Sequence, residues 1–259
     1  MKNKIKHGIW IVANFFGYVT GFPFLAPLHH LVALFALHGL GYDNRYGGNL
    51  TGEYWFIKKV LPAIGDAACI DIGAHVGHYS ETLARHIAGP IYAVEPLSSS
   101  FAILEKQTNP RIHPYKLAIT DFDGFAPIYS RKEKGEDATL SAEAMTDSSI
   151  EEQIPVATLD SFVKELGIKN LGFVKIDTEG HEKEVLSGMR TILKEHPPAF
   201  IQFEFNFGHL KRGHTLYSLT TLLPGYDFYR LVSHGMVQIH PDKYIDNMFM
   251  YSNLIAKRK

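Results

Sequence analysis

The chain has 259 residues, of which 46% are hydrophobic and 20% are charged, and its formal net charge at pH 7 is −1. This length allows one or two globular domains with a substantial core, and the balanced charge gives no reason to expect a nucleic-acid partner. The only cysteine is Cys69, so an intrachain disulfide is excluded, and its apolar neighbours predict a buried structural thiol.

The N-terminal segment differs in composition from the rest. Lysines stand at positions 2, 4 and 6, and residues 7–42 then contain no Asp, Glu, Lys or Arg. One interpretation is a signal peptide, which the missing A-x-A-like cleavage site disfavours. A second is a membrane-inserted or interfacial anchor with Trp10 and Tyr18 at the interface, although glycines and a proline interrupt the roughly 20 apolar residues that a spanning helix needs. The third is a pair of short helices packed on the following domain or on a second subunit.

After residue 52 the chain alternates apolar runs with segments of helical period, so we expect an N-terminal helical segment and linker at 1–52 and an α/β domain at 53–259. Strands are expected at residues 69–72, 91–94, 112–119, 125–129, 154–156, 171–176, 199–205, 226–232 and 248–255, and helices at 53–61, 76–87, 97–104, 160–166 and 179–193. Residues 43–52 are expected to form a linker or lid, and residues 130–152 a loop over or beside the site. The alternation predicts a mostly parallel sheet whose last two strands pair antiparallel.

The stretch CIDIGAHVGHYS, residues 69–80, predicts a strand, a tight glycine turn and a helix. It brings Asp71, Gly73 and Gly77 to the carboxyl end of a strand, where ligands bind in open α/β sheets. Glu95 ends the next strand, 24 positions after Asp71. This is close to the roughly 20-residue spacing at which a carboxylate can bind a ribose.

The glycine spacing bears on the ligand. Ala74 and His75 lie between Gly73 and Gly77, so the dinucleotide pattern G-x-G-x-x-G is missing. A glycine turn with an acid two residues before it suits a ligand without phosphates, such as S-adenosylmethionine, whose amino group and sulfonium carry positive charge. An ordinary turn of another α/β domain remains the alternative.

A second run of strand, acid, glycine and helix follows in FVKIDTEGHEKEVLSGM, residues 173–189. Asp177, Glu179, His181 and Glu182 crowd the strand end and the helix start. Acids at a helix N-terminus are favoured by roughly 0.3–1 kcal/mol each, so capping explains Glu179 and Glu182 as well as function does. Asp177 is harder to explain by capping alone.

The next strand, AFIQFEFNFGH, places Gln202, Glu204 and Asn206 on one face. Because a central parallel strand is normally apolar on both faces, we expect this face to line a cavity. A carboxylate satisfied by a loop or a basic side chain is the alternative for Glu204. His209 and His214 follow, but no compact zinc-ligand spacing is present.

With both motifs in view, the chain resembles the FkbM family of S-adenosylmethionine-dependent methyltransferases over about residues 53–256. The matching runs are DIGAHVG at 71–77, VEP at 94–96, VATLD at 156–160, QFEFN at 202–206 and, most specifically, VKIDTEGHE at 174–182. The resemblance implies a Rossmann-like class I methyltransferase fold, an α/β fold with a mostly parallel seven-stranded sheet and helices on both faces. It also implies O-methylation of a hydroxyl on a saccharide or natural-product small molecule. It does not cover residues 1–50 and does not fix the acceptor.

The resemblance and the motifs together give a set of expected site residues. Cofactor contacts are expected from Asp71, Gly73, Ala74, His75, Gly77, Glu95, Pro96, Ala118 and Asp177, and catalysis from Asp177, Glu179, His181 and Glu204. Gly73 and Gly77 would hold the amino-acid end of the cofactor and Glu95 its ribose hydroxyls. Asp71 would orient the loop or the cofactor's amino group.

His181 is the best candidate base by its ordinary pKa, with a satisfied structural histidine as the alternative. No metal is expected, although Asp177, Glu204 and Asn206 offer oxygen ligands for Mg²⁺. We expect a small-molecule or saccharide acceptor, no nucleic acid, and a cytoplasmic location because S-adenosylmethionine is an intracellular cofactor. Contact with a membrane surface through residues 8–40 and a homo-oligomer are both compatible with the sequence.

Two other functions stay open. One is a non-catalytic, membrane-associated protein that retains the cofactor pocket, which the uncharged N-terminus suggests. The other is a nicotinamide-dependent oxidoreductase on the same fold, against which the missing G-x-G-x-x-G counts.

Overall fold

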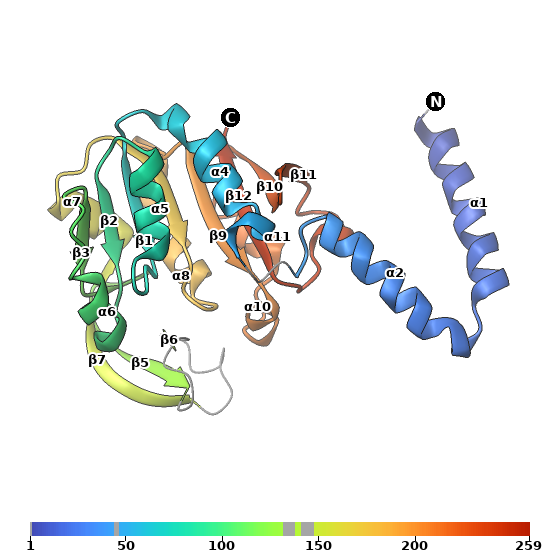
Figure 1. The fold of residues 1–259 in the computed structure, drawn as a ribbon, viewed down its shortest axis with the longest axis horizontal. Coiled ribbons are helices and arrows are strands. Elements are labelled where there is room, and N and C mark those ends of the chain that lie inside the picture. The colour runs from blue at the N-terminus through green and yellow to red at the C-terminus, as the bar shows by residue number, and fades with distance from the viewer. Residues whose placement is uncertain (1, 44–46, 132–137, 141–147) are drawn as a thin grey trace. The chain divides into compact units, whose positions relative to one another are not determined.

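The computed structural model describes residues 2–43, 47–131, 138–140 and 148–259. The chain divides into two compact units, Met1–Leu40 and Gly41–Lys259. The first unit contains helix α1 (Lys2–Thr20), a 3₁₀ turn (Pro23–Leu25) and helix α2 (Ala26–Gly39). Within the described residues, neither helix alone has the length and apolar composition of a membrane span. His7–Thr20 and Pro23–Gly39 meet those criteria only as a pair, bent by 106° (Figure 1).

The second unit is built on a large sheet, which has eight strands in the described chain, in the order β11-β10-β12-β9-β8-β1-β2-β3 (Figure 1). These strands are β1 (Ala68–Ile72), β2 (Ile91–Val94), β3 (Ile112–Tyr115), β8 (Leu171–Ile176), β9 (Phe200–Phe205), β10 (Tyr226–Val232), β11 (Gly235–Ile239) and β12 (Ser252–Arg258). The pairs from β9 to β3 are parallel, whereas β12, β10 and β11 pair antiparallel. This confirms the mostly parallel α/β sheet and the antiparallel pairing of the last two predicted strands. There is one strand more than the seven expected, because β11 folds back on β10 in a hairpin that pairs Val232 with Gly235.

Helices cover both faces of this sheet. They are α3 (Gly48–Thr51), α4 (Glu53–Lys59), α5 (His78–His86), α6 (Ser98–Leu104), α7 (Leu159–Glu165), α8 (Glu182–Ser187), α9 (Arg190–Glu195), α10 (Phe207–Lys211) and α11 (Leu216–Thr220). In the part of this unit that the structure describes, 3₁₀ turns lie at Leu61–Ile64 and Tyr244–Asp246.

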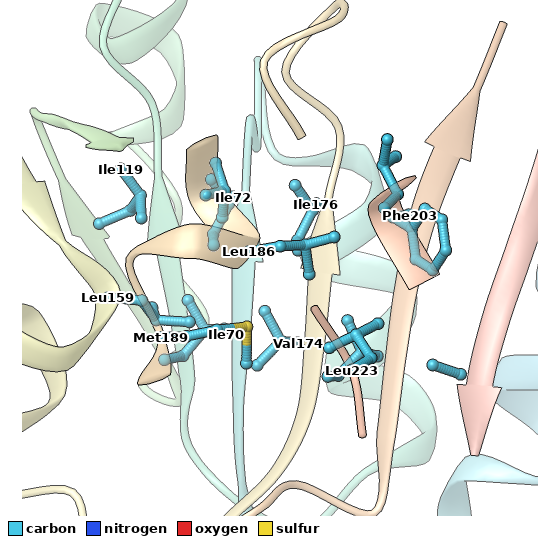
Figure 2. Packing of buried hydrophobic residues seen from close by; sticks show 14 of the residues in the cluster. Ile70, Ile72, Ile119, Leu159, Val174, Ile176, Leu186, Met189, Phe203 and Leu223 are labelled. Carbon is cyan, nitrogen blue, oxygen red and sulfur yellow. The ribbon is translucent and has the colours of Figure 1, made fainter. Parts of the chain in front are cut away.

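Alternate residues of the central strands enter two different cores. Ile70 and Val174 pack with Leu186 and Met189 of the α8–α9 region on one face (Figure 2). On the other face, Cys69 joins a core that includes residues of α4 and α5, and its thiol is fully buried, as predicted. The strands are thus apolar on both faces, as expected for a parallel sheet covered by helices.

A second, smaller sheet has the order β4-β7-β5-β6 in the described residues. Its strands are β4 (Ala118–Thr120), β5 (Gly124–Arg131), β6 (Ala138–Thr139) and β7 (Ser148–Thr158). The short strand predicted at 125–129 is confirmed within β5, and the one at 154–156 lies within β7.

Two predictions for this region were wrong. The strand expected at 112–119 is two strands in different sheets, because β3 loses its partner where β2 ends, at the Val94–Tyr115 pair. The loop expected at 130–152 begins and ends as strand, because β5 pairs antiparallel with β7 over residues that show no clear local pattern. Residues 132–137 and 141–147 of that loop lie outside the described residues.

The helix expected at 179–193 was also wrong in its extent. It starts only at Glu182, because Glu179 and Gly180 adopt the positive φ values of 52° and 96°. It breaks at Gly188, where a Cβ atom would lie 2.2 Å from the carbonyl oxygen of Thr120. The glycine at position 188 therefore lets the chain pass close to β4 at the point where the helix breaks.

The start of the second unit includes part of the expected linker. Tyr42 is buried, and the guanidinium of Arg230 lies 3.6 Å from the centre of its ring. Thr51 is buried as well, whereas residues 44–46 lie outside the described residues. The organisation of residues 1–52 as a separate domain stays a prediction.

Candidate active site

A cavity of about 310 Å³ lies at the carboxyl ends of β1, β2 and β8. Residues of the large sheet, such as Ile72 and Val94, line one side of the cavity, and residues of the small sheet, such as Ile119 and Ile128, form a second side, called the wall below. Its lining consists of Ile72, Gly73, His75, Val94, Glu95, Pro96, Leu97, Ser100, Leu117, Ala118, Ile119, Ile128, Leu140, Asp177, Thr178, Glu179 and His181. This is the edge of the sheet at which ligands bind in open α/β folds.

The loops after β1 and β8 touch at Gly73. Its φ is +78°, and a Cβ atom there would lie 1.8 Å from the carbonyl oxygen of Asp177. The amide of Asp177 in turn donates a hydrogen bond to the carbonyl of Ile72 over 3.0 Å. Only glycine fits this contact, and the two sequence motifs therefore form one continuous edge of the cavity.

Positive φ values recur at the cavity in residues other than glycine. His75 has a φ of 51° and Glu179 a φ of 52°, and both line the cavity. Such conformations cost free energy and tend to cluster at functional sites. Each motif loop thus holds one side chain in an unfavourable backbone conformation beside the cavity.

Glu95 joins the first motif loop to the segment after β2. Its carboxylate accepts hydrogen bonds from the backbone amides of His75 at 2.8 Å and Leu97 at 2.9 Å. Burial raises the pKa of Glu95 to about 7, although both amide hydrogen bonds favour the charged form. Since Glu95 also lines the cavity, it can bind a ligand while fixing the loop.

A buried ion cluster lies at the same end of β1 and β8. Lys175 donates a hydrogen bond to Asp177 over 2.9 Å and lies 3.6 Å from Asp71, which also accepts from Ser80 at 2.7 Å. Burial alone would lower the pKa of Lys175, but the charges of Asp177, Asp71 and Glu53 outweigh it and raise the pKa. The ammonium therefore stays charged. Asp71 is fully buried, a position that suits orienting the loop rather than contacting a ligand's amino group.

The loop after β8 is held by Glu182. Its Oε1 atom accepts hydrogen bonds from the amide and the hydroxyl of Thr178, at 3.0 and 3.1 Å, and from the amide of Gly180 at 3.3 Å. These contacts go to the loop before α8 and do not cap the helix, which has no side-chain cap at His181. They fix the loop that carries Asp177 and Glu179.

The other carboxylate oxygen of Glu182 lies 2.9 Å from Nε2 of His209. Nδ1 of His209 accepts from the backbone amide of Asn206 at 3.2 Å, which leaves Nε2 as the ring nitrogen that faces Glu182. Burial alone would raise the pKa of Glu182, but His209 and the amide of Thr178 bring it down to about 2. The pair links the loop after β8 to helix α10.

Three carboxylates gather at this end of the sheet. Oxygen atoms of Asp177, Glu179 and Glu204 all lie within 4.8 Å of one another. Burial and then the charges of Asp177, Glu179 and Glu182 raise the pKa of Glu204 well above its ordinary range, although the amide of Asn206 donates to it. Glu204 is therefore set to hold a proton beside two carboxylates that line the cavity. Oxygen ligands of this kind also suit a hard divalent cation.

His181 lines the cavity, and both of its ring nitrogens lie near protein groups. Nε2 lies 2.8 Å from the hydroxyl of Thr120, and Nδ1 lies 3.6 Å from the carboxylate of Glu184. Burial lowers the pKa of His181, so the ring is neutral at pH 7. This geometry fits a satisfied structural histidine, and the base role stays a prediction.

None of Gln202, Glu204 and Asn206 lines the cavity, which corrects the expectation for the polar face of β9. The hydroxyl of Tyr79 donates to Gln202 at 2.7 Å, and the Gln202 amide donates to Glu53 at 2.8 Å. Side chains from α4 and α5 thus satisfy this face. Glu204, on the same face, adjoins the cavity through Asp177 and Glu179.

Most of the expected site residues lie in one place. The cavity is lined by Gly73, His75, Glu95, Pro96, Ala118 and Asp177 of the expected cofactor contacts, and by Asp177, Glu179 and His181 of the expected catalytic group. Four expected residues do not line it, namely Asp71, Ala74, Gly77 and the catalytic candidate Glu204. Ala74 is buried, and Gly77, with a φ of +92°, precedes α5.

Lys175, Thr178 and the cavity residues Ile128 and Leu140 were missed, whereas Ala118 of the small sheet was expected. A lysine in an otherwise apolar strand was a usable signal for Lys175. The wall residues Ile128 and Leu140 had no such signal, because they come together only when the small sheet forms.

Much of the second unit matches a known family. A family model described as the methyltransferase FkbM domain matches residues 71–232, more than half of the chain. Among curated proteins no match was found.

Solved structures of methyltransferases are distantly similar. A putative O-methyltransferase from Klebsiella pneumoniae matches with 11% identity and a TM-score of 0.45, covering 96% of this chain and 96% of that chain. An O-methyltransferase from Bacillus cereus in complex with SAH has 11% identity and a TM-score of 0.44, covering 89% and 90%. Fibrillarin from Aeropyrum pernix with natively bound S-adenosyl-L-methionine has 10% identity and a TM-score of 0.41, covering 77% and 67%. These scores are too low to support an inference, so the family assignment rests on the family model.

Proposed function

The chain belongs to the FkbM methyltransferase family, and we propose that it transfers a methyl group from S-adenosylmethionine to a hydroxyl of a saccharide or natural-product small molecule. The observation that carries the proposal is the cavity at the ends of β1, β2 and β8, which both family motifs line. Membership of this family supports methyl transfer, and the expected cofactor, S-adenosylmethionine, is a methyl donor.

The cavity residues fit the parts of this cofactor. Glu95 has lone pairs beyond those used by the two backbone amides and can accept from the ribose hydroxyls. Apolar side chains such as Leu97 and Leu117 offer a surface for the purine ring, and Gly73 lines the cavity where the amino-acid end would lie. Asp177 supplies negative charge for the ammonium or the sulfonium.

When bound, the cofactor supplies an electrophilic methyl group: the carbon–sulfur bond breaks with its electron pair remaining on sulfur, and a carbon–oxygen bond forms. The protein has to align the acceptor hydroxyl, exclude water and take up the hydroxyl proton. Asp177 and Glu179, which line the cavity, would orient the hydroxyl and receive this proton, with Glu204 beside them as a further acceptor. His181 is the competing base.

Calorimetric titration with S-adenosylmethionine, S-adenosylhomocysteine and NAD tests the proposal. We expect micromolar binding of both adenosyl ligands, lost in Glu95→Ala and retained in the exposed control Glu105→Ala. Binding of NAD alone would support the oxidoreductase instead. Cofactor binding without methyl transfer to any of a panel of glycosides and hydroxylated small molecules would favour the non-catalytic alternative.

The proposal includes the setting in which the enzyme acts. A cytoplasmic location follows from the supply of S-adenosylmethionine inside cells, and the net charge of −1 gives no support to a nucleic-acid acceptor. A homo-oligomer and membrane contact through residues 8–40 remain part of the proposal. Sedimentation of the purified full chain tests the first of these.

A further inference from the structure

The apolar N-terminal unit is not used by the proposed chemistry. Residues 7–42 lack acidic and basic side chains, apart from four histidines, and helix α2 contains no buried residue. Exposed apolar side chains continue from one helix into the other, among them Trp10, Phe15, Phe24 and Phe35. In water such a surface is costly, at about 25 cal/mol for each Å² of apolar area.

The exposed apolar side chains surround α1 instead of forming a stripe. Ile9, Trp10, Ile11 and Val12 are consecutive, and each is between 58% and 67% exposed. Because consecutive residues of a helix point about 100° apart, these four project in all directions around the axis. A protein partner covers one side of a helix, whereas lipid covers every side, and a helix that is apolar all round is typical of a membrane environment.

The bend between the helices has its polar groups paired internally. The carbonyl of Thr20 lies 3.1 Å from Nε2 of His29 and accepts from the amide of Phe22 at 2.8 Å, while the Thr20 hydroxyl donates to Phe16. Within hydrocarbon every backbone polar group must find such a partner. The same contacts fix the two helices as a V, drawn in blue in Figure 1.

The dimensions of the V match half of a bilayer. The segment His7–Thr20 is about 21 Å long at 1.5 Å per residue. A bend of 106° leaves about 74° between the arms. If both arms tilt equally, the first reaches a depth of about 17 Å and the second, Pro23–Gly39, about 20 Å, against about 15 Å for half of the hydrocarbon core. The tip, at residues 21–23, would lie near the bilayer midplane.

From these observations we propose that residues 7–39 form a re-entrant hairpin that inserts into one leaflet of an anionic lipid bilayer, with both ends at the same face. The lysines at positions 2, 4 and 6 complement anionic headgroups, each contributing about 1 kcal/mol near the surface. No acidic residue precedes Asp43 to oppose them. The inference does not depend on methyl transfer, and it specifies how the membrane contact would be made.

Vesicle flotation of the full chain tests the insertion. We expect flotation with vesicles of phosphatidylcholine and phosphatidylglycerol in equal parts, and at least about tenfold weaker partition to phosphatidylcholine alone. Phe15→Asp and Phe35→Asp should each weaken partition by at least about tenfold, because a carboxylate is costly within hydrocarbon. The matched control Phe125→Asp changes an equally exposed phenylalanine in β5 and should float like the unaltered chain.

The same preparations separate this proposal from its rivals. A chain that does not float overturns it. A soluble oligomer that Phe15→Asp dissociates would also overturn it, and would identify a second copy of the chain as the partner of these helices. S-adenosylmethionine titration of Phe15→Asp and Phe35→Asp should match the unaltered chain, so failure of the hairpin is distinguishable from failure of the cofactor site.

Quenching by brominated lipids measures the depth. The chain has two tryptophans, so Trp55→Phe leaves Trp10 as the sole reporter. Trp10 should be quenched best by bromines near the headgroup. A Phe22→Trp reporter in the Trp10→Phe/Trp55→Phe background should be quenched best by bromines deep in the acyl chains. Shallow quenching at both positions would mean that the helices lie flat on the surface, and would overturn the hairpin.

Discussion

The Nε2 atom of His209 lies 2.9 Å from the carboxylate of Glu182, and neither side chain is exposed to solvent. The pair lies between the loop that carries Asp177 and the helix that follows β9. Since Glu182 also accepts from Thr178 and Gly180, one buried carboxylate fixes the backbone on which the proposed catalytic acids stand.

Glu182→Gln should lower the free energy of unfolding by about 3 kcal/mol at pH 7, because an amide cannot satisfy both His209 and the loop amides. Because the pKa of Glu182 is about 2 when folded and about 4.3 when unfolded, its contribution is present above the unfolded pKa and is lost as the pH falls toward 2. The unaltered chain should therefore lose stability between pH 5 and 2 more steeply than the variant. Urea unfolding measures both effects.

The control for this variant is Glu81→Gln, which removes an exposed pair with Arg85 and should change the free energy of unfolding by less than about 0.5 kcal/mol. Equal losses in the two variants would contradict the role of Glu182.

Gly73→Ala should cost several kcal/mol and abolish cofactor binding, because the new Cβ atom would overlap the carbonyl of Asp177. Gly167→Ala isolates the conformational part of this cost. Gly167 has a φ of +64°, but a Cβ atom added there would meet nothing within 4 Å, so about 1 kcal/mol is expected. Urea unfolding and calorimetry on both variants test the comparison. Similar losses in the two would show that the contact between the motif loops is unimportant.

Cofactor affinity should rise about tenfold between pH 6 and 8. The pKa of Glu95 is about 7, and the charged carboxylate is the better acceptor for ribose hydroxyls. Glu95→Gln should bind S-adenosylmethionine more weakly and without this pH dependence, whereas Glu105→Gln should keep the profile of the unaltered chain. Calorimetric titrations at several pH values give the measurement. An unchanged profile in Glu95→Gln would assign the pH dependence to another group.

His181→Asn should keep methyl transfer within about tenfold of the unaltered enzyme if the carboxylates take up the proton. Glu179→Gln should then lose at least about a hundredfold, the usual contribution of a general base. Single-turnover rates on an acceptor drawn from the glycoside panel provide the test. The reverse order of losses would return the base role to His181.

Glu204→Gln should stabilise the fold at pH 8. The folded pKa of Glu204 is raised, so its contribution is present below the unfolded pKa of about 4.3 and is lost as the pH rises through the folded value. Glu184 offers the opposite case, because hydrogen bonds from Arg212 outweigh burial and lower its pKa. Glu184→Gln should therefore destabilise at pH 8. Thermal unfolding at pH 4 and 8 compares the two variants, and destabilisation by Glu204→Gln at pH 8 would refute the proton-holding role.

The main strands were predictable because they are short apolar runs between turn signals. The strands at 91–94, 171–176 and 226–232 have the predicted bounds. The local sequence pattern could not predict which strands pair with each other. Whether residues 118–120 continue β3 or join another sheet depends on where β2 ends, and β11 is a half-exposed edge strand that β10 holds through its hairpin.

The acids of the site were predictable because they stand at strand ends beside glycines. The sequence did not predict which of these acids is enclosed by the protein and which lines the cavity. Asp71 and Glu95 look alike in sequence, yet Lys175 and Ser80 enclose one while the other lines the cavity. Similarly, nothing in the alternation of β9 distinguishes Gln202, which α4 and α5 satisfy, from Glu204, which joins the carboxylates.

The passage of the chain from β3 to β4 has a consequence for specificity. Between Tyr115 and Ala118 the backbone leaves the large sheet and enters the small one. The cavity therefore lies between two separately hydrogen-bonded sheets, here called the large and the small framework. The loops expected to hold the cofactor belong to the large framework, and Ile128 and Leu140 belong to the small one. Substitutions of Ile128 or Leu140 should therefore change the shape of the cavity while the loops after β1, β2 and β8 keep their geometry.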